Sequence, residues 1–360
     1  MNICIIGDGL TSLSLAKNLV NKKINIHFYH KNKVKNSPSS RTIGISKNNL
    51  EFFKKEICKT PKKIFWEIKK IEIYSEKLVN ENLLEFESDK NCLFYMVKND
   101  KLYLTLINEL SKNKYFKKKI SNNKGLSSIK DYELIINCDY FNHVTKRYFN
   151  KKIEKEYNSI AYTTIIKHEK FLNDSAMQIF TKKGPLAFLP ISNFETSVVY
   201  SVHDSANICK KDIEELIQIY NFKYKIKKIQ KIHYFKLKSL NLRSYYHDNI
   251  LAFGDLLHRI HPLAGQGFNM TVRDIKTLTN IIKNKYDLGL PLDSSVNSEF
   301  ENISKYKNFL FSNGIDLIHE FFNLERKINN NILSKSVQFL SKNSSLNKLF
   351  TKIADKGIVF

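Results

Sequence analysis

The pattern of apolar and polar residues predicts alternating strands and helices at the beginning of the chain. Residues 2–6 form a short apolar run that is typical of a buried strand, and residues 24–29 form a second one. Between them, apolar residues recur at helical spacing at Leu13, Leu15, Ala16, Leu19 and Val20. A strand, a helix and a second strand in this order predict a βαβ unit.

The same pattern divides the rest of the chain into three parts. Residues 249–253 predict a buried strand, which a loop joins to a helix with apolar positions at Met270, Val272, Ile275, Leu278, Ile281 and Ile282. From about 155 to 240, aromatic and β-branched runs such as 197–202 predict a β-rich region. Beyond residue 301 the spacing predicts amphipathic helices. The expected class is α/β (α+β), with a Rossmann-like βαβ part, a β-sheet part and a helical C-terminus.

The turn after the first strand carries two glycines at the spacing of a dinucleotide-binding motif. Gly7 suits the tight turn, and Gly9 lets a pyrophosphate approach the N-terminus of the helix. Ser12 stands in the place of the third glycine and is small enough for the helix to pack on the strand. The second strand ends in His30, where such motifs carry an acidic residue for the ribose. His30 is either a hydroxyl ligand or only a polar strand end.

The loop between residues 254 and 274 combines backbone-shaping residues with polar residues at fixed spacing. Glycines at 265 and 267 let the backbone approach a ligand, and the helix start beyond them presents free N–H groups. The run resembles the second flavin motif of the single-component aromatic-ring hydroxylases (class A flavoprotein monooxygenases) at Gly254, Asp255, His258, Pro262, Gly265, Gln266, Gly267, Asn269 and Asp274. The resemblance implies that Asp255 binds a ribityl hydroxyl of FAD and that residues 262–267 lie against the isoalloxazine ring.

Two further segments follow in the order of that family. Residues 40–46 resemble the arginine-bearing segment that contacts FAD, so Arg41 is either a phosphate ligand or a surface arginine. Residues 137–140 occupy the place of an Asp-Gly pair that bears on flavin and nicotinamide binding. Tyr140 stands where the family has glycine, and a tyrosine would be strained in a turn with positive φ. We therefore expect a rearranged loop, in which a reductant contact of Asp139 is in doubt.

The central region resembles the ubiquinone-biosynthesis hydroxylases within this family. The resemblance rests on residues 157–161, 178–190 and 311–357, whereas residues 60–92 and 203–240 carry little of it. It implies that Gly184 and Pro185 lie on the substrate side of the flavin, although Gly-Pro is equally typical of a turn between strands.

The resemblance implies an FAD-dependent monooxygenase that uses NAD(P)H and O₂. It would hydroxylate the aromatic ring of a polyprenylated phenol in ubiquinone biosynthesis through a flavin C4a-hydroperoxide, so that the cofactor carries the chemistry. His258 and His261 flank the flavin loop and are candidates for a proton step, although a structural role is favoured for both. Two alternatives stay open: another FAD-dependent oxidoreductase of the same fold, and a non-catalytic flavin-binding or assembly protein with eroded motifs.

The expected domains are interleaved along the chain. Residues 1–65, 93–154 and 241–300 would form the FAD-binding domain, residues 66–92 and 155–240 the β-rich substrate domain, and residues 301–360 the C-terminal helices. Those helices either pack on the catalytic domains or form the mouth of an apolar tunnel for a polyprenyl tail.

The charge and the cysteine pattern bear on which partners, metals and disulfides we expect. Lysine and arginine outnumber aspartate and glutamate by 59 to 35, for a net charge of +24. No nucleic-acid-binding motif accompanies this charge, so a nucleic-acid partner is not expected, whereas weak contact with an anionic membrane or a ubiquinone-biosynthesis complex stays open. Five dispersed cysteines without a C-x-x-C pair indicate neither a metal site nor disulfides. Without a long apolar run or a signal-peptide pattern, we expect a cytoplasmic protein, soluble or peripheral to the inner membrane.

Overall fold

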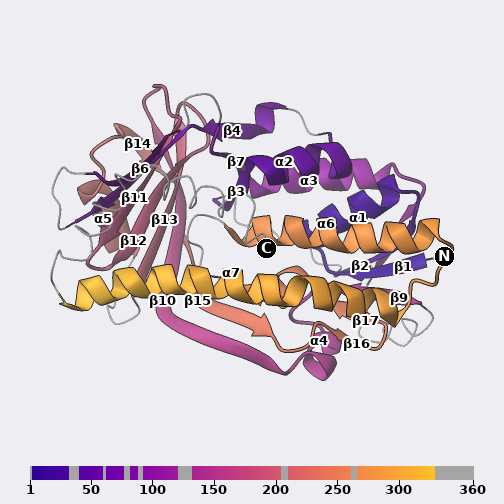
Figure 1. The fold of residues 1–360 in the computed structure, drawn as a ribbon. Coiled ribbons are helices and arrows are strands. Elements are labelled where there is room, and N and C mark those ends of the chain that lie inside the picture. Colours follow the sequence, from indigo (N-terminus) through magenta and orange to yellow (C-terminus); the bar gives the residue numbers. More distant parts are fainter. Residues whose placement is uncertain are drawn as a thin grey trace.

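The computed structural model describes residues 2–31, 40–59, 62–76, 82–87, 92–120, 132–203, 210–260 and 266–328. Within these ranges the chain forms two large sheets, a small three-stranded sheet and the helices that cover them. Figure 1 shows the nine-stranded sheet at one end of the molecule and the helix α7 running along the molecule toward it. The predicted combination of a βαβ part, a β-rich part and a helical C-terminal part is confirmed.

The first large sheet has six strands in the order β16-β17-β9-β1-β2-β8. All neighbours are parallel except β16, which is antiparallel to β17. The strands are β1 (Asn2–Ile6), β2 (Asn25–His30), β8 (Phe116–Ile120), β9 (Leu134–Asn137), β16 (Tyr246–His247) and β17 (Ile250–Ala252). Because parallel strands end at the same edge, the residues that follow β1, β2, β9 and β17 come together there.

Helices pack closely around this sheet, which is why its central strands are continuously apolar. The helix α1 (Leu10–Asn21) packs against α3 (Asn99–Ser111) and α6 (Gln266–Asp287). Ile3 and Ile5 of β1 are fully buried, as are Leu13 and Leu19 of α1. The βαβ unit predicted from residues 2–30 is therefore the centre of the main hydrophobic core.

The three-stranded sheet contacts α3 and α6 and has the order β3-β7-β4. It consists of β3 (Thr42–Ser46), β7 (Phe94–Lys98) and β4 (Phe65–Ile68), and β3 leads into α2 (Lys47–Phe52) and the π-helix η1 (Phe53–Ile57). A short 3₁₀ turn, η2 (Lys62–Ile64), precedes β4.

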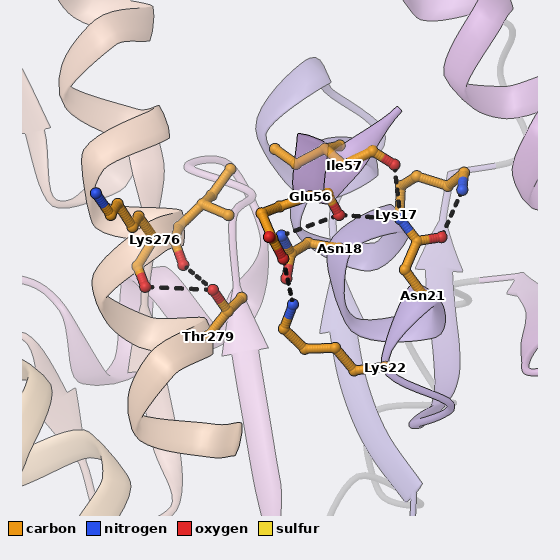
Figure 2. Close-up of polar contacts among 9 residues, drawn as sticks. Lys17, Asn18, Asn21, Lys22, Glu56, Ile57, Lys276 and Thr279 are labelled. Atoms are coloured by element: carbon orange, nitrogen blue, oxygen red, sulfur yellow. Dashed lines mark hydrogen bonds and ion pairs between the residues drawn. The ribbon is translucent and has the colours of Figure 1, made fainter. Parts of the chain in front are cut away.

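Side chains of α1 hold the end of the π-helix, as Figure 2 shows. Asn21 Nδ2 donates to the carbonyl oxygens of Glu56 (2.9 Å) and Ile57 (2.8 Å). Lys22 Nζ lies 3.1 Å from Glu56 Oε2. The last carbonyls of a helix lack partners within it, so these bonds fix η1 on α1.

The second large sheet has nine strands and forms the β-rich region. Its order is β18-β15-β10-β13-β12-β11-β5-β6, and β14 pairs with β10. The strands are β5 (Lys70–Ser75), β6 (Asn82–Glu87), β10 (Lys152–His168), β11 (Ser175–Thr181), β12 (Gly184–Pro190), β13 (Glu195–His203), β14 (Ile226–Ile229), β15 (His233–Leu242) and β18 (His258–Arg259). The helix α5 (Lys210–Ile219) buries Ile213 and Ile217 in a hydrophobic cluster with residues of this sheet.

The helix α7 (Ser294–Ile328) contacts both large sheets. Near its start, Phe300 packs against Phe253, just beyond β17. Further along, Ser312 accepts a hydrogen bond from Asn241 of β15 (3.1 Å), and Asp316 accepts one from Tyr157 of β10. Residues 329–360, for which the sequence also predicts helix, lie outside the described residues. No helix in the described ranges is long and apolar enough to cross a membrane.

Candidate functional site

Two glycines stand at the carboxyl edge of the six-stranded sheet, and the fold requires both. Gly7 follows β1 with φ +127°, and a Cβ atom there would lie 3.2 Å from Cys138 Cβ. Gly254 follows β17 with φ +68°, and its Cβ would lie 2.5 Å from Thr11 Cγ2. Positive φ disfavours other residues at both positions. The two predicted motifs, which lie nearly 250 residues apart, therefore meet at this edge.

The N-terminus of α1 faces open space at the same edge. Gly9 caps the helix in an extended conformation without a side-chain cap, and no acidic residue occurs in the first turn. A Cβ at Gly9 would meet nothing within 4 Å. Ser12 is buried and its hydroxyl donates to the Gly9 carbonyl (2.8 Å), so it closes the turn from within. Unpaired N–H groups at an open helix N-terminus suit a phosphate.

Asp255 is exposed beside this helix start, in the short 3₁₀ turn η4 (Gly254–Leu256). Burial raises the pKa of the Cys138 thiol, and the charges of Asp139 and Asp255 raise it further. Asp255 directly follows Gly254, which packs on Thr11 of α1. Asp255 is therefore placed where its carboxylate can accept hydrogen bonds from hydroxyls of a bound nucleotide.

The residues after β9 form a loop that is fixed by side chains. Asp139 accepts a hydrogen bond from the Phe141 amide (2.9 Å) and pairs with Lys31 Nζ at 2.7 Å. Positive φ at described non-glycine residues is confined to positions 23, 158 and 248, so Tyr140 does not adopt the left-handed turn of a glycine. The strained turn that a tyrosine would make at a glycine position is therefore avoided at Tyr140.

The Tyr140 ring lies between two cations from the nine-stranded sheet. Lys152 Nζ is 4.8 Å and Arg259 Cζ is 4.9 Å from the ring centroid. The Tyr140 hydroxyl donates to Glu154 (3.0 Å) and accepts from Lys152 (2.6 Å). Cation–π contacts and hydrogen bonds therefore join this loop to β10 and β18.

His30 ends β2 at the same edge and is half-buried. Its Nδ1 lies 3.1 Å from the carbonyl oxygen of Lys31. Because Lys31 pairs with Asp139, the strand end that the sequence assigns to ribose recognition is tied to the loop after β9. His30 is thus close enough to this edge for either of its predicted roles.

The start of α6 contains a buried acceptor atom without a hydrogen-bond partner, which indicates a place for a ligand donor. Gln266 is only 7% exposed, and its Oε1 has no hydrogen-bond partner in the described part of the chain. The first turn of α6 contains no acidic residue, and a Cβ at Gly267 would meet nothing within 4 Å. A buried acceptor without a partner is costly, so a ligand donor here would be stabilising. His261, Pro262 and Gly265 lie outside the described residues.

Asn269 acts as a tie between α6 and the segment that carries Arg41. Its Oδ1 accepts from the Ser46 amide (2.9 Å) and from Asn49 Nδ2 (3.0 Å), and its Nδ2 donates to the Gly44 carbonyl (3.0 Å). The side chain, which the sequence assigns to the cofactor, thus fixes β3 on α6. Arg41 itself is exposed at the beginning of β3.

The segment around Arg41 also contacts the nine-stranded sheet. Thr42 Oγ1 donates to Ser197 Oγ of β13 (2.8 Å), and Ser40 Oγ lies 3.4 Å from Thr163 Oγ1 of β10. Arg41, between these two residues, therefore lies at the junction of the small sheet and the nine-stranded sheet.

His258 and Gly184 occupy positions with clear packing roles. His258 is 2% exposed, and its Nε2 lies 2.5 Å from Asp274 Oδ2. Gly184 ends the hairpin turn between β11 and β12 with φ +137°, and a Cβ there would lie 2.0 Å from the Ser201 carbonyl oxygen. Gly184 and Pro185 begin β12 directly after the turn at residues 182–183 and pair with Thr181 and Phe180 of β11.

Three residues that contact candidate site residues were not predicted from the sequence. Thr11 fills the space next to Gly254, Lys31 pairs with Asp139, and Asn308 of α7 donates to Asp274 (3.0 Å). Their partners are distant in sequence or depend on loop geometry, so no local pattern marks them.

The residues at this edge fit FAD. Gly7 and Gly9 leave room for a pyrophosphate, Asp255 offers an exposed carboxylate, and Gln266 offers an acceptor at the second helix start. A glycine turn, a helix N-terminus and a carboxylate at one edge of a parallel sheet are the arrangement that binds a dinucleotide. Fold and site together define a protein of the FAD-binding class.

Comparison with known proteins agrees with this class. A family described as an FAD binding domain matches residues 149–287. The structure is similar to that of p-nitrophenol 4-monooxygenase PnpA from Pseudomonas putida DLL-E4, with a TM-score of 0.79 and 10% identity over 99% of this chain and 98% of the other. It is also similar to Klebsiella pneumoniae HpxO complexed with FAD and uric acid, with a TM-score of 0.73 and 11% identity over 98% and 96% of the chains.

Similar sequences include ubiquinone-biosynthesis enzymes. The 3-demethoxyubiquinol 3-hydroxylase of Escherichia coli (strain K12) is 30% identical over 158 residues, which are 41% of this chain and 40% of the relative. The mitochondrial ubiquinone biosynthesis monooxygenase COQ6 of Schizosaccharomyces pombe is 20% identical over 277 residues, 63% and 57% of the two chains. The matches thus span about two-fifths to three-fifths of these relatives. The resemblance to the aromatic-ring hydroxylases and their ubiquinone-biosynthesis subfamily is confirmed.

Proposed function

We propose that this protein is an FAD-dependent monooxygenase that hydroxylates the aromatic ring of a polyprenylated phenol in ubiquinone biosynthesis, with NAD(P)H and O₂ as co-substrates. The observation that carries the proposal is the convergence of Gly7, Gly254 and Asp255 at one edge of a parallel sheet. The polyprenylated phenol is proposed from the named activities of the relatives.

Each group at the edge has a part in holding FAD. The N–H groups at the start of α1 would bind the pyrophosphate, Asp255 would accept from ribityl hydroxyls, and Arg41 would add a cation beside the phosphates. His30 would contact the adenosine ribose. The start of α6, from Gln266 and Gly267, would lie at the isoalloxazine ring. When bound, FAD would supply the redox chemistry and the activation of O₂.

The protein's own part is to orient the substrate and exclude water. Asn269 holds β3 on α6, and Thr42 and Ser40 join β3 to β13 and β10. The ion pair between Lys98 and Glu195 (2.8 Å) adds a second tie between the small sheet and β13. We assign the substrate ring to this junction of the sheets, beside the start of α6. A prenylated substrate would favour peripheral contact with a membrane or with a ubiquinone-biosynthesis complex.

The decisive experiment is an absorbance spectrum of the purified protein, with and without Asp255→Ala. We expect a flavin band in the wild type and weaker FAD binding in the variant, because the ribityl ligand is lost. Asp287→Ala is the matched control, since Asp287 is also an exposed aspartate but lies at the end of α6. A wild-type protein that cannot be loaded with FAD would refute the proposal.

Product mass then tests the reaction. With NAD(P)H, O₂ and a prenylated phenol, we expect a product that has gained one oxygen atom. NAD(P)H oxidation with an unchanged phenol would instead indicate another FAD-dependent oxidoreductase of the same fold.

A further inference from the structure

A buried polar cluster lies on the side of α6 that faces α7, and the proposed chemistry does not use it. His258 Nε2 lies 2.5 Å from Asp274 Oδ2, and the other carboxylate oxygen of Asp274 accepts from Asn308 Nδ2 at 3.0 Å. His258 is 2% and Asp274 3% exposed, and Asn308 is also buried. The three residues come from β18, α6 and α7, so one carboxylate joins three elements.

The hydrogen bonds of this cluster hold β18, α6 and α7 together firmly, because all three side chains are buried and water cannot take the place of a lost partner. A buried carboxylate needs hydrogen-bond donors on its oxygens, and here each oxygen has one. Removing one donor would leave part of the carboxylate buried and unsatisfied. The relative positions of β18, α6 and α7 are therefore coupled at this point.

The cluster joins β18 to the helix whose start the proposed function places at the flavin. His258 belongs to β18, and Asp274 lies on α6, which begins at Gln266. Ile260, directly after β18, also packs in a small apolar cluster with Met270, Phe311 and Ile315. The end of β18 is thus attached to both α6 and α7.

We propose that His258, Asp274 and Asn308 are positioning residues that fix β18 and α6 relative to α7, and so set how tightly and in what environment the flavin is held. The flavin part rests on the function proposed above, whereas the fixing of β18 and α6 does not. The cluster further makes α7 part of the flavin site without any contact between α7 and the cofactor.

The first test is hydrogen exchange of the FAD-free protein, which does not depend on the proposed function. We expect Asp274→Asn to speed amide exchange of peptides covering residues 256–270 about tenfold, because it weakens the hydrogen bonds that join α6 to β18 and α7. His168→Gln is the matched control: His168 is equally buried and bonds Thr196 Oγ1 through Nε2 at 3.0 Å, but it belongs to the nine-stranded sheet. It should leave exchange of these peptides unchanged.

Asn308→Ala provides a milder second variant, since it removes one donor and leaves the His258–Asp274 pair. It should raise exchange in the same peptides by a smaller factor than Asp274→Asn. Unchanged exchange of residues 256–270 in both variants would overturn the proposal. Exchange that rises equally across the whole chain would do the same, because it would show only general destabilisation.

The second test uses the FAD-loaded protein. We expect Asp274→Asn to raise the Kd for FAD and to shift the flavin absorbance bands, while His168→Gln changes neither. A wild type that binds no FAD would remove the proposed function but leave the exchange result to decide on the cluster. A wild type that binds FAD, with identical Kd and bands in Asp274→Asn, would refute the flavin part of the inference.

Discussion

Gly254 allows the cost of backbone strain to be separated from the cost of a steric clash at the flavin edge. Gly254 has φ +68°, and an added Cβ would lie 2.5 Å from Thr11 Cγ2. Gly289, after α6, has φ +69°, but a Cβ there would meet nothing within 4 Å. The two glycines therefore share one backbone conformation and differ in their surroundings.

The expected magnitudes follow from this comparison. A left-handed conformation costs a non-glycine residue about 1–2 kcal/mol, which is the whole effect expected for Gly289→Ala. Overpacking adds about 1–3 kcal/mol, so Gly254→Ala should lower the free energy of unfolding by about 2–5 kcal/mol. Thr11→Ala removes the Cγ2 atom that would clash. When Thr11→Ala is combined with Gly254→Ala, it should restore most of the free energy of unfolding that the clash removes. It should restore none of the free energy that the backbone strain removes.

The assay is urea unfolding of Gly254→Ala, Gly289→Ala, Thr11→Ala and the double variant of Gly254→Ala with Thr11→Ala. Each variant is then titrated with FAD. Because Asp255 follows Gly254 directly, the shift that relieves the clash should also weaken FAD binding in Gly254→Ala and not in Gly289→Ala. Equal losses of stability in the two glycine variants would refute the reasoning. So would a double variant that is no more stable than Gly254→Ala alone.

Three further predictions concern stability. Gly184→Ala should lower the free energy of unfolding by at least about 3 kcal/mol in urea unfolding, since φ is +137° and the Cβ would lie 2.0 Å from a backbone oxygen; wild-type stability would contradict the hairpin geometry. Asn269→Leu should cost about 2–5 kcal/mol and weaken FAD binding, because it leaves buried backbone groups of β3 unpaired; a neutral result would exclude its role as a tie. Burial raises the pKa of Tyr200 to about 12, so its contribution to stability is complete below pH 10 and is lost as the pH rises toward 12. Tyr200→Phe should flatten the loss of stability between pH 10 and 12 in urea unfolding, and an unchanged slope would contradict the assignment.

The sequence by itself determined the βαβ unit and the two glycine motifs. These features depend on short-range physics: apolar periodicity separates strand from helix, and glycine marks a turn with positive φ. Residues 2–30, 249–260 and 266–282 contain the predicted strands and helices, and Gly7 and Gly254 have positive φ. The expected rearrangement at Tyr140 came from the same local argument.

Tertiary structure alone decided which distant residues meet. Asn269 stood in a motif assigned to the cofactor, but its side chain is bonded to residues about 220 positions earlier in the chain. The sequence assigned residues 66–92 to the β-rich domain, but only the fold decided that residues 70–75 pair in parallel with β11. Hydrogen bonds across such separations follow from how the sheets and helices pack, and packing is not encoded in the spacing of any one segment. The sequence therefore specified the parts of the flavin edge, and the fold decided which of their side chains are left to bind a ligand.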